Sequence, residues 1–198
     1  MSGGEIEMIV IGGSAGALDA VGALLSALPP AFALPVAVIL HLPPTQPSRL
    51  VEVLGAKTRL VTREPDDKEP IVPGTIYVGP PNYHLLVERR RAFALSVDPP
   101  VLFSRPSIDV LFESAAEAYG PRLAGVVLSG ASEDGARGLA RVRRGGGLTL
   151  VESPATAAVP VMPRAALQLG PADHVAPAAA LGPLLARLAA PADSQEAR

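Results

Sequence analysis

Three residues of this sequence have the side-chain types that nucleophilic ester hydrolysis needs. Ser14, His41 and Asp134 each come shortly after a short apolar segment. A serine hydroxyl attacks a carbonyl carbon when an imidazole removes its proton and a carboxylate orients that imidazole. If the three segments are neighbouring parallel strands, their ends meet at one edge of the sheet. The spacing therefore predicts a Ser-His-Asp serine esterase acting on a carboxyl ester.

Ser14 stands in the segment Gly12-Gly13-Ser14-Ala15-Gly16, which matches the pattern G-x-S-x-G. Small neighbours allow a sharp turn from strand to helix that leaves the hydroxyl exposed. The helix N-terminus beyond supplies unpaired N–H groups for an oxyanion. A serine before a helix is also a common N-cap, and position alone does not separate the two roles. The glycine spacing fits neither a dinucleotide-binding loop nor a P-loop, so nucleotide binding is disfavoured.

The general base is one of three histidines. His41 ends a predicted strand and is placed to meet Ser14. Imidazole titrates at about pH 6.5, which suits a group that takes a proton from serine and returns it to a leaving alcohol. His84 begins a predicted hairpin strand, and His174 lies near the C-terminal edge of the fold.

The orienting acid has two candidates, Glu133 and Asp134, which lie in the same glycine-containing loop. An aspartate before a helix is also commonly an N-cap. Spacing alone does not choose between the two carboxylates. The chain order Ser…His…Asp differs from the Ser…Asp…His order of α/β-hydrolases, so this is not an ordinary member of that fold.

Short apolar segments alternate with amphipathic ones along the chain, which predicts a doubly wound α/β fold with a mostly parallel sheet. We predict strands at residues 6–11, 35–40, 60–62, 123–128 and 148–151. We predict helices at residues 15–28, 48–56, 107–119, 135–144, 163–169 and 178–189. Residues 75–79, 84–88 and 92–97 are expected to form antiparallel hairpins added to the sheet.

Composition narrows the functional classes. The chain has 198 residues, 48% of them hydrophobic, which suits one compact domain. A net charge of -2 gives no reason to expect nucleic acid or an anionic membrane as partner. Cysteine is absent, and no cluster of His and carboxylates has metal-ligand spacing. No apolar run has the length of a membrane span, and the first residues lack a secretory signal, so we expect a soluble cytoplasmic protein.

Several separated segments resemble the catalytic domain of the bacterial chemotaxis protein-glutamate methylesterases, the CheB type. The likeness runs from about Met8 to Leu188. The matching segments are Ile11-Gly12-Gly13-Ser14-Ala15-Gly16, Leu40-His41-Leu42-Pro43-Pro44, Pro73-Gly74-Thr75-Ile76-Tyr77-Val78-Gly79-Pro80, Arg105-Pro106-Ser107-Ile108-Asp109-Val110-Leu111-Phe112, Leu128-Ser129-Gly130 through Asp134-Gly135-Ala136, and Met162-Pro163-Arg164-Ala165. Several such blocks in the right order are far more specific than any one motif.

The resemblance implies that the family's triad falls on Ser14, His41 and Asp134, which favours Asp134 over Glu133. It implies hydrolysis of glutamate γ-methyl esters on the cytoplasmic helices of methyl-accepting chemoreceptors, with release of methanol and with deamidation of receptor glutamines as a side activity. No cofactor, metal, nucleic acid or membrane insertion is implied.

Four further residues complete the expected site. We expect the backbone N–H groups of Ala15 and Ala131 to hold the oxyanion. We expect Arg105 and Ser107 to border the cleft and contact the substrate protein; a surface arginine ahead of a helix explains Arg105 equally well.

The chain departs from the family pattern at three places. The family's Ser-Thr-Gly-Gly is Ser-Ala-Gly-Ala at residues 14–17, its Thr-Gly-Met-Gly is Ser-Gly-Ala-Ser at 129–132, and the glycine before Met-Pro-Arg is Val161. These changes are expected to alter the shape of the cleft. The first two changes replace side chains only, so the backbone N–H groups expected to hold the oxyanion are retained.

The expected organisation is a catalytic domain over residues 1–190 and a disordered tail over 191–198, without the N-terminal receiver domain of the best-known family members. Two rival functions remain at this point. One is a non-catalytic signalling module of the same fold, motivated by the altered flanks of Ser14 and Asp134. The other is a general hydrolase of small carboxyl esters, which requires a deeper pocket.

Overall fold

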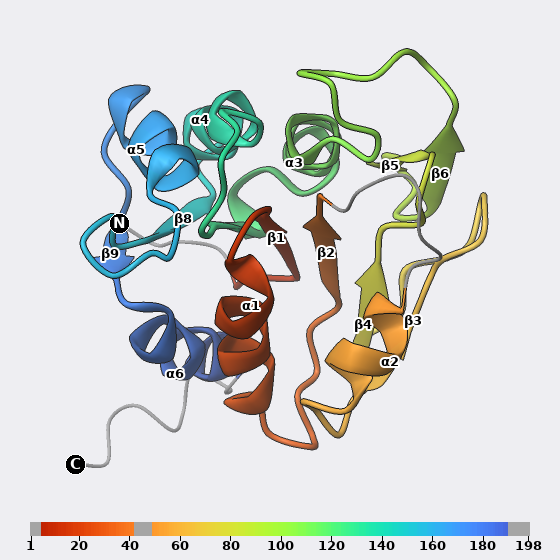
Figure 1. Cartoon of the computed structure of the whole chain (residues 1–198). Helices are drawn as coiled ribbons and strands as arrows, with labels where there is room; N and C mark the ends of the chain where they lie inside the picture. The colour runs from red at the N-terminus through yellow and green to blue at the C-terminus, as the bar shows by residue number, and fades with distance from the viewer. Residues whose placement is uncertain (1–4, 42–48, 190–198) are drawn as a thin grey trace.

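The computed structural model describes residues 5–41 and 49–189 of the chain. Within these residues, seven parallel strands form one sheet in the order β3-β4-β2-β1-β7-β8-β9 (Figure 1). Helices pack on both faces of this sheet, and β5 and β6 form a separate antiparallel hairpin. The predicted doubly wound α/β fold is confirmed.

The strands of the sheet are β1 (Met8–Gly13), β2 (Val36–Leu40), β3 (Val61–Arg63), β4 (Thr75–Val78), β7 (Leu123–Val127), β8 (Leu148–Glu152) and β9 (His174–Ala176). Every residue of β1, β2, β4 and β7 is buried. Strands covered on both faces need apolar side chains at every position, which explains their continuous apolar sequences.

The helices divide into two layers (Figure 1). One face of the sheet carries α1 (Ala17–Ser26), α2 (Leu50–Gly55) and α6 (Ala178–Leu188), and the other carries α3 (Ile108–Tyr119), α4 (Ala136–Arg144) and α5 (Val161–Gln168). Helix α3 shows why such segments fold as they do. Its buried residues Ile108, Leu111, Phe112 and Ala115 recur at helical spacing and form one apolar face.

Strand β1 lies at the point where the order of strands in the sheet switches from one side to the other. From β1 the chain passes to β2 on one side, whereas β7 and β8 lie on the other side. The carboxyl ends of β1, β2 and β7 therefore lie next to one another. In open parallel sheets, such a point is where ligands bind.

The antiparallel addition differs from the prediction in one strand. Residues 75–79 were expected in a hairpin, but β4 pairs in parallel with β2 and β3 inside the main sheet. Its four residues are all buried, as a central strand requires. The hairpin consists of β5 (His84–Val87) and β6 (Phe93–Ser96) alone.

Several element boundaries differ from the prediction by one or two residues, and one strand was not predicted. Helix α1 begins at Ala17, later than expected, because Gly16 has a left-handed φ of 77° and ends the turn that precedes the helix. Strand β9 was not predicted, since three residues at a sheet edge carry little pattern.

The expected disordered tail, 191–198, lies outside the described residues. None of the helices in the described part of the chain has the length and hydropathy that a membrane crossing requires.

Candidate active site

Main-chain pairing brings Ser14 and His41 together at the edge of the sheet. Gly13 of β1 pairs with Leu40 of β2, so Ser14 and His41 are the next residues of two adjacent strands. The His41 N–H donates to the Gly13 carbonyl at 3.1 Å, and the Ser14 N–H donates to the Ser129 carbonyl, beyond β7, at 2.9 Å. Both residues are thus positioned by the sheet itself.

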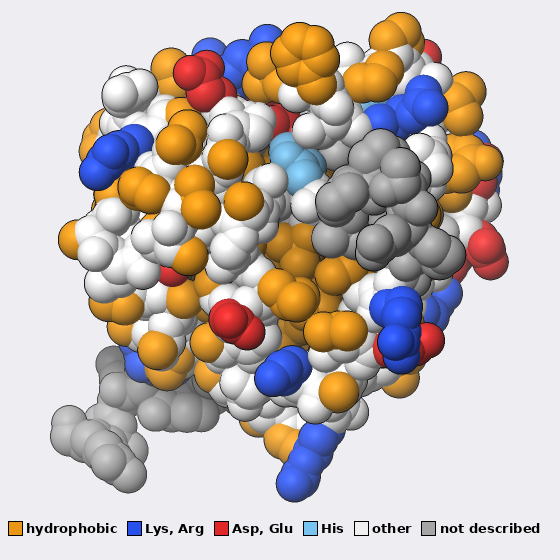
Figure 2. All heavy atoms as spheres, in the orientation of Figure 1, with side chains coloured by type: hydrophobic (Ala, Val, Ile, Leu, Met, Phe, Trp, Pro, Cys, Tyr) orange, Lys and Arg blue, Asp and Glu red, His pale blue; other side chains and the backbone are white. Residues whose placement is uncertain are grey.

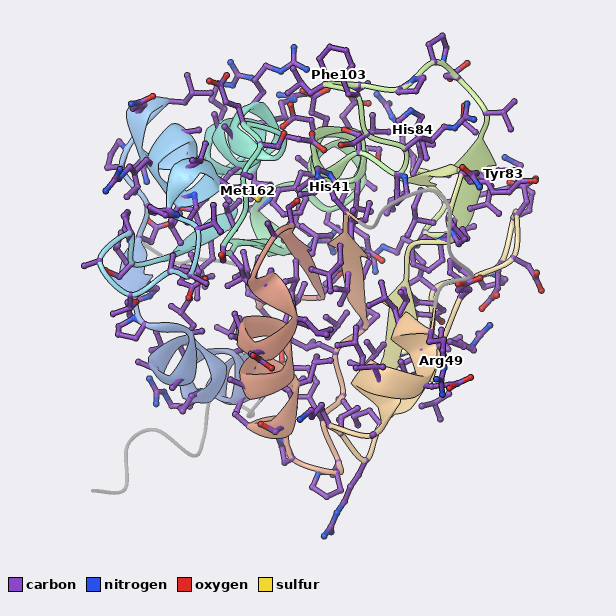
Figure 3. The ribbon with its side chains drawn as sticks, viewed as in Figure 1. His41, Arg49, Tyr83, His84, Phe103 and Met162 are labelled. Atoms are coloured by element: carbon purple, nitrogen blue, oxygen red, sulfur yellow. The ribbon has the colours of Figure 1, made fainter. Side chains whose placement is uncertain are left out.

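The imidazole of His41 bonds directly to Asp134. The distance from His41 Nε2 to Asp134 Oδ2 is 2.8 Å, and the two side chains are 12% and 0% exposed. Figure 3 shows His41 at the end of β2. The carboxylate offers only acceptor atoms, so Nε2 carries the hydrogen and Nδ1 keeps its lone pair. Nδ1 is therefore the nitrogen available as a base.

Asp134 is held as an anion at the N-terminus of α3. Its carboxylate accepts hydrogen bonds from the Ile108 N–H at 2.7 Å, the Asp109 N–H at 2.9 Å and the Ser107 hydroxyl at 2.8 Å. Burial raises the pKa of Asp134, but these hydrogen bonds and the one from His41 lower it more, so the pKa lies below its ordinary value. A permanently charged, fixed acid is what the orientation of an imidazole requires.

The capping roles considered for Ser14 and Asp134 are not the ones observed. Helix α1 has Gly16 as its N-cap without a side-chain hydrogen bond, so Ser14 does not cap it. Helix α4 likewise has Gly135 as its N-cap. Asp134 instead caps α3, a different helix from the one that it precedes.

Asp109, in α3, caps the start of α4 in the same way that Asp134, just before α4, caps the start of α3. This buried residue of α3 accepts hydrogen bonds from the Gly135 N–H at 2.9 Å and the Gly138 N–H at 2.7 Å, at the start of α4, and from Arg137 Nε at 3.0 Å. Asp109 is not among the predicted site residues, although it lies in the segment 105–112 that resembles the family.

Among the residues that the structure describes, the serine whose hydroxyl hydrogen-bonds to His41 is Ser104 and not Ser14. The Ser104 hydroxyl lies 3.3 Å from His41 Nδ1, the nitrogen that faces away from Asp134. Because Nδ1 keeps its lone pair, the hydroxyl donates. Sequence reasoning did not single out Ser104; the one signal was its position directly before the family-like segment that begins at Arg105.

Ser14 is half-buried and packs closely against the loop after β7. A Cβ atom at Gly130 would lie 3.0 Å from Ser14 Cβ and 2.6 Å from Met162 Cε. Only glycine fits between these two side chains, and the Met162 N–H donates to the Gly130 carbonyl at 2.9 Å. The loop and the start of α5 therefore fix one wall beside Ser14.

The N–H groups of the two expected oxyanion donors are unpaired in the part of the chain that the structure describes. Ala15 and Ala131 are both exposed, and their N–H groups donate to no acceptor within the described residues. Unpaired N–H groups directly after the candidate nucleophile and in the facing loop are the arrangement that stabilises a developing oxyanion.

The two expected substrate contacts have internal partners. Ser107 is fully buried, where its hydroxyl donates to Asp134 and accepts from the Val110 N–H as the N-cap of α3. Arg105 donates to the carbonyls of Val97 at 2.8 Å and Asp98 at 3.1 Å. These contacts position the acid and a loop, respectively, and burial removes Ser107 from the surface that a substrate touches.

The remaining candidates lie outside the site. His84 is buried between the Ser107 N–H, which donates to its Nδ1 at 3.2 Å, and the Pro99 carbonyl, which accepts from its Nε2 at 3.1 Å. His174 is exposed on β9, and Glu133 is exposed in its loop. In the described ranges, no group of His, Cys, Asp or Glu side chains is arranged to hold a metal ion.

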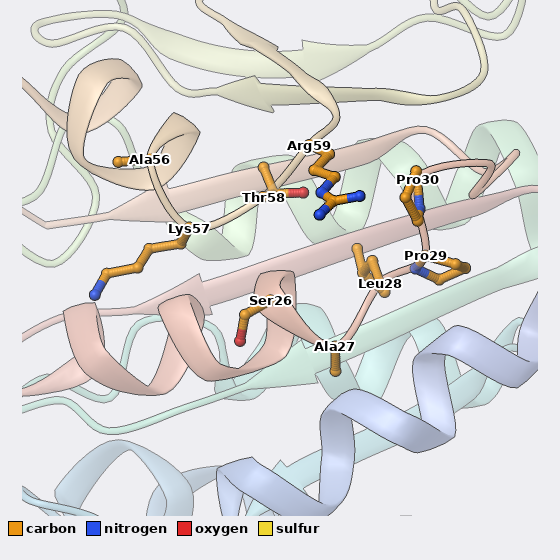
Figure 4. Close-up of a pocket in the computed structure, with 9 residues that line it drawn as sticks. All are labelled: Ser26, Ala27, Leu28, Pro29, Pro30, Ala56, Lys57, Thr58 and Arg59. Carbon is orange, nitrogen blue, oxygen red and sulfur yellow. The ribbon is translucent and has the colours of Figure 1, made fainter.

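A cavity of about 520 Å³ lies at the far end of α1 from Ser14 (Figure 4). Residues 26–30 and 56–59 line it, including Lys57 and Arg59. Helix α1 has ten residues and is therefore about 15 Å long, which separates this cavity from the candidate active site.

Several known proteins are similar in sequence to this chain. A putative protein-glutamate methylesterase/protein-glutamine glutaminase of Leptospira interrogans is 41% identical over 182 residues, covering 92% of this chain and 94% of that protein. Protein-glutamate methylesterase/protein-glutamine glutaminase 2 of Anaeromyxobacter dehalogenans is 41% identical over 173 residues, covering 87% of this chain and 50% of that protein.

A solved structure has the same fold. The catalytic domain of the Thermotoga maritima CheB methylesterase superposes with a TM-score of 0.87 at 30% identity, covering 92% of this chain and 98% of that one. Residues 9–185 match the family described as CheB methylesterase. The chain therefore belongs to the CheB methylesterase family.

Proposed function

We propose that this chain is a protein-glutamate methylesterase in which Ser14 is the nucleophile, His41 the general base and Asp134 the acid that orients the base. The observation that carries the proposal is the 2.8 Å hydrogen bond from His41 Nε2 to the buried Asp134 carboxylate, at the strand end next to Ser14. Family membership supports a methyl ester of a protein glutamate as the substrate.

The proposed reaction gives the two ring nitrogens of His41 different roles, with Nε2 bonded to Asp134 and Nδ1 acting as the base. His41 Nδ1 removes the proton from Ser14 Oγ, which attacks the carbonyl carbon of the ester. The N–H groups of Ala15 and Ala131 hold the oxyanion while Asp134 stabilises the imidazolium. The tetrahedral intermediate then expels methanol, which takes its proton from His41. Water attacks the acyl-enzyme through the same base and releases the free glutamate carboxylate.

The same steps apply to a glutamine side chain, with ammonia as the leaving group in place of methanol. The names of the relatives, methylesterase and glutaminase together, support this second activity. We further propose the cytoplasmic helices of methyl-accepting chemoreceptors as the substrate, which places the protein in the cytoplasm.

Ser14 is preferred to Ser104 as the nucleophile because of the surrounding main chain. Ser104 closes a tight turn, whereas Ser14 lies between the end of β1 and the N-terminus of α1. Ser14 is followed by the free N–H of Ala15 and faces the loop that contains Ala131. A nucleophile without nearby oxyanion donors loses about 10²–10³ in rate per missing donor. Ser104 is then a positioning residue. Its hydroxyl orients His41 through the hydrogen bond to Nδ1, and the Ser14 hydroxyl replaces it at Nδ1 in the reaction.

The test compares Ser14→Ala with Ser104→Ala on a methylated cytoplasmic fragment of a chemoreceptor, with released methanol as the measurement. Ser14→Ala is expected to abolish turnover at an unchanged melting temperature. Ser104→Ala is expected to retain turnover within about a hundredfold, since it removes only an orienting contact. Loss of turnover in Ser104→Ala with turnover kept in Ser14→Ala would reassign the nucleophile. A wild-type protein that binds the fragment without releasing methanol would favour the non-catalytic module.

A further inference from the structure

A tight turn over Val101–Ser104 carries two bulky apolar residues at its tip. Val101 and Ser104 pair through reciprocal main-chain hydrogen bonds of 3.1 and 2.8 Å, with Leu102 and Phe103 between them. The φ angles of these two residues are 47° and 64°. Positive φ at both central residues is typical of a type I′ turn, which strongly prefers Asn-Gly. Leucine and phenylalanine are strained there, and such strain clusters at functional sites.

The tip is also unusually exposed for its residue types. Phe103 is 102% exposed and Leu102 is 44% exposed, so the aromatic ring touches almost nothing of its own chain. Figure 3 shows Phe103 above His41, projecting away from the fold, and Figure 2 shows hydrophobic side chains at this rim above the histidine visible on the same face. Local backbone preference and folding stability both disfavour this arrangement, which indicates selection for contact with another molecule.

The turn is fixed relative to the catalytic groups. Ser104, the residue next to Phe103, donates to His41 Nδ1 at 3.3 Å. At the base of the loop, the Arg105 guanidinium holds the Val97 and Asp98 carbonyls. The aromatic ring is therefore presented by a braced loop, and a braced anchor loses less conformational entropy on binding than a free one.

We propose that the tip formed by Leu102 and Phe103 is a docking contact for the substrate protein, packing against an apolar side chain on the helix that carries the ester. The inference rests on the proposed function, because a glutamyl ester reaches His41 only if its own polypeptide covers the adjoining surface. Side chains that are whole turns apart lie on the same face of a helix, so an apolar residue on the ester-bearing face of the substrate helix is the expected partner of the tip. Aromatic residues, phenylalanine included, are enriched in the cores of protein interfaces.

The test replaces Phe103 by asparagine, which tolerates positive φ better than phenylalanine and so preserves the turn. Two substrates are compared: the methylated chemoreceptor fragment and a glutamate γ-methyl ester capped at both ends. We expect the ratio of kcat/KM for the fragment to that for the small ester to fall about tenfold in Phe103→Asn, through KM. Leu169→Asn removes an equally apolar, 54% exposed side chain after α5 and is the control, with an unchanged ratio.

Binding supplies a readout that does not depend on turnover. In a Ser14→Ala background, the Kd for the receptor fragment is expected to rise about tenfold on Phe103→Asn. An unchanged ratio together with an unchanged Kd overturns the docking role. So does a change of oligomeric state in sedimentation with receptor binding intact, which would make the tip a contact between copies of this chain. Absence of methanol release by the wild type, with the Kd still dependent on Phe103, would reject the proposed function and keep the docking surface.

Discussion

Asp109 and Asp134 each cap the helix that belongs to the other's segment. Asp134, just before α4, accepts from the N–H groups that begin α3, and Asp109, within α3, accepts from those that begin α4. Carboxylates are favoured at helix N-termini by the helix dipole and by the unpaired N–H groups there. The position of the acid on His41 is thereby tied to the packing of two helices.

The first prediction concerns Asp109→Asn. The amide keeps one acceptor oxygen but turns an NH₂ group toward donors at the start of α4, so we expect a loss of about 1–3 kcal/mol in the free energy of unfolding. Urea denaturation measures it. Glu113→Gln, on the exposed face of the same helix, is the control and should change the free energy of unfolding little. Equal stability of the two variants would contradict the capping role.

The second prediction separates the two carboxylates of the loop after β7. Asp134→Asn should lower kcat by about 10⁴, because an amide holds the wrong imidazole tautomer. Glu133 is exposed, so Glu133→Gln should change kcat little. Turnover of one methyl ester at fixed pH decides between them. A crippled Glu133→Gln beside a mild Asp134→Asn would move the acid by one residue.

The third prediction uses two buried carboxyl groups with opposite pKa shifts. Burial raises the pKa of Glu152, which accepts from the Ser129 N–H, whereas hydrogen bonds hold the pKa of Asp134 low despite burial. The stabilising contribution of protonated Glu152 is present below the ordinary pKa of glutamate, about 4.3, and is lost as the pH rises through the folded-state pKa. The stabilising contribution of ionised Asp134 is present above the ordinary pKa of aspartate, about 3.9, and is lost as the pH falls through the lower folded-state pKa.

The measurement is the free energy of unfolding of Glu152→Gln and of Asp134→Asn against wild type, across acid to neutral pH. Relative to wild type, Glu152→Gln should gain stability as the pH rises. Asp134→Asn should lose it over the same rise. The same sign of pH dependence for both variants would show that one of the two shifts has been assigned in the wrong direction.

The fourth prediction concerns Gly130→Ala. The flexible end of Met162 can move away from the new methyl group, but Ser14 Cβ, at 3.0 Å, is fixed by its main chain. The new methyl group requires Ser14 to shift by a few tenths of an ångström, and since a misplacement of about 1 Å costs about 10² in rate, kcat should fall by a smaller factor, about tenfold. Gly22→Ala, where the nearest atom is the Lys57 side chain at 3.5 Å, is the control and should retain full turnover.

Sequence reasoning located the strands other than β9, although it misassigned the partners of β4, and it singled out the three triad candidates, because each of these depends on local pattern. Continuous apolar runs marked the buried strands, and Ser14, His41 and Asp134 follow three of them. The contacts that hold Asp134 join residues 25 or more positions apart, and no local pattern encodes them. The Ser104 contact with His41 spans 63 positions and escaped for the same reason. Ser107 was predicted to contact the substrate, but its hydroxyl is buried and donates a hydrogen bond to Asp134, in a loop 27 positions away, and no local pattern indicates that bond.

The main-chain hydrogen bonds that hold Ser14 and His41 have a consequence for how this site can change over evolutionary time. The positions of both residues are set by the N–H and carbonyl groups of Gly13, Ser14, His41 and Ser129, and none of these bonds uses the two reactive side chains. The scaffold therefore does not depend on the chemistry that it carries. A descendant in which another small group replaces the hydroxyl, or in which turnover is lost, can therefore keep the same main-chain arrangement at this site.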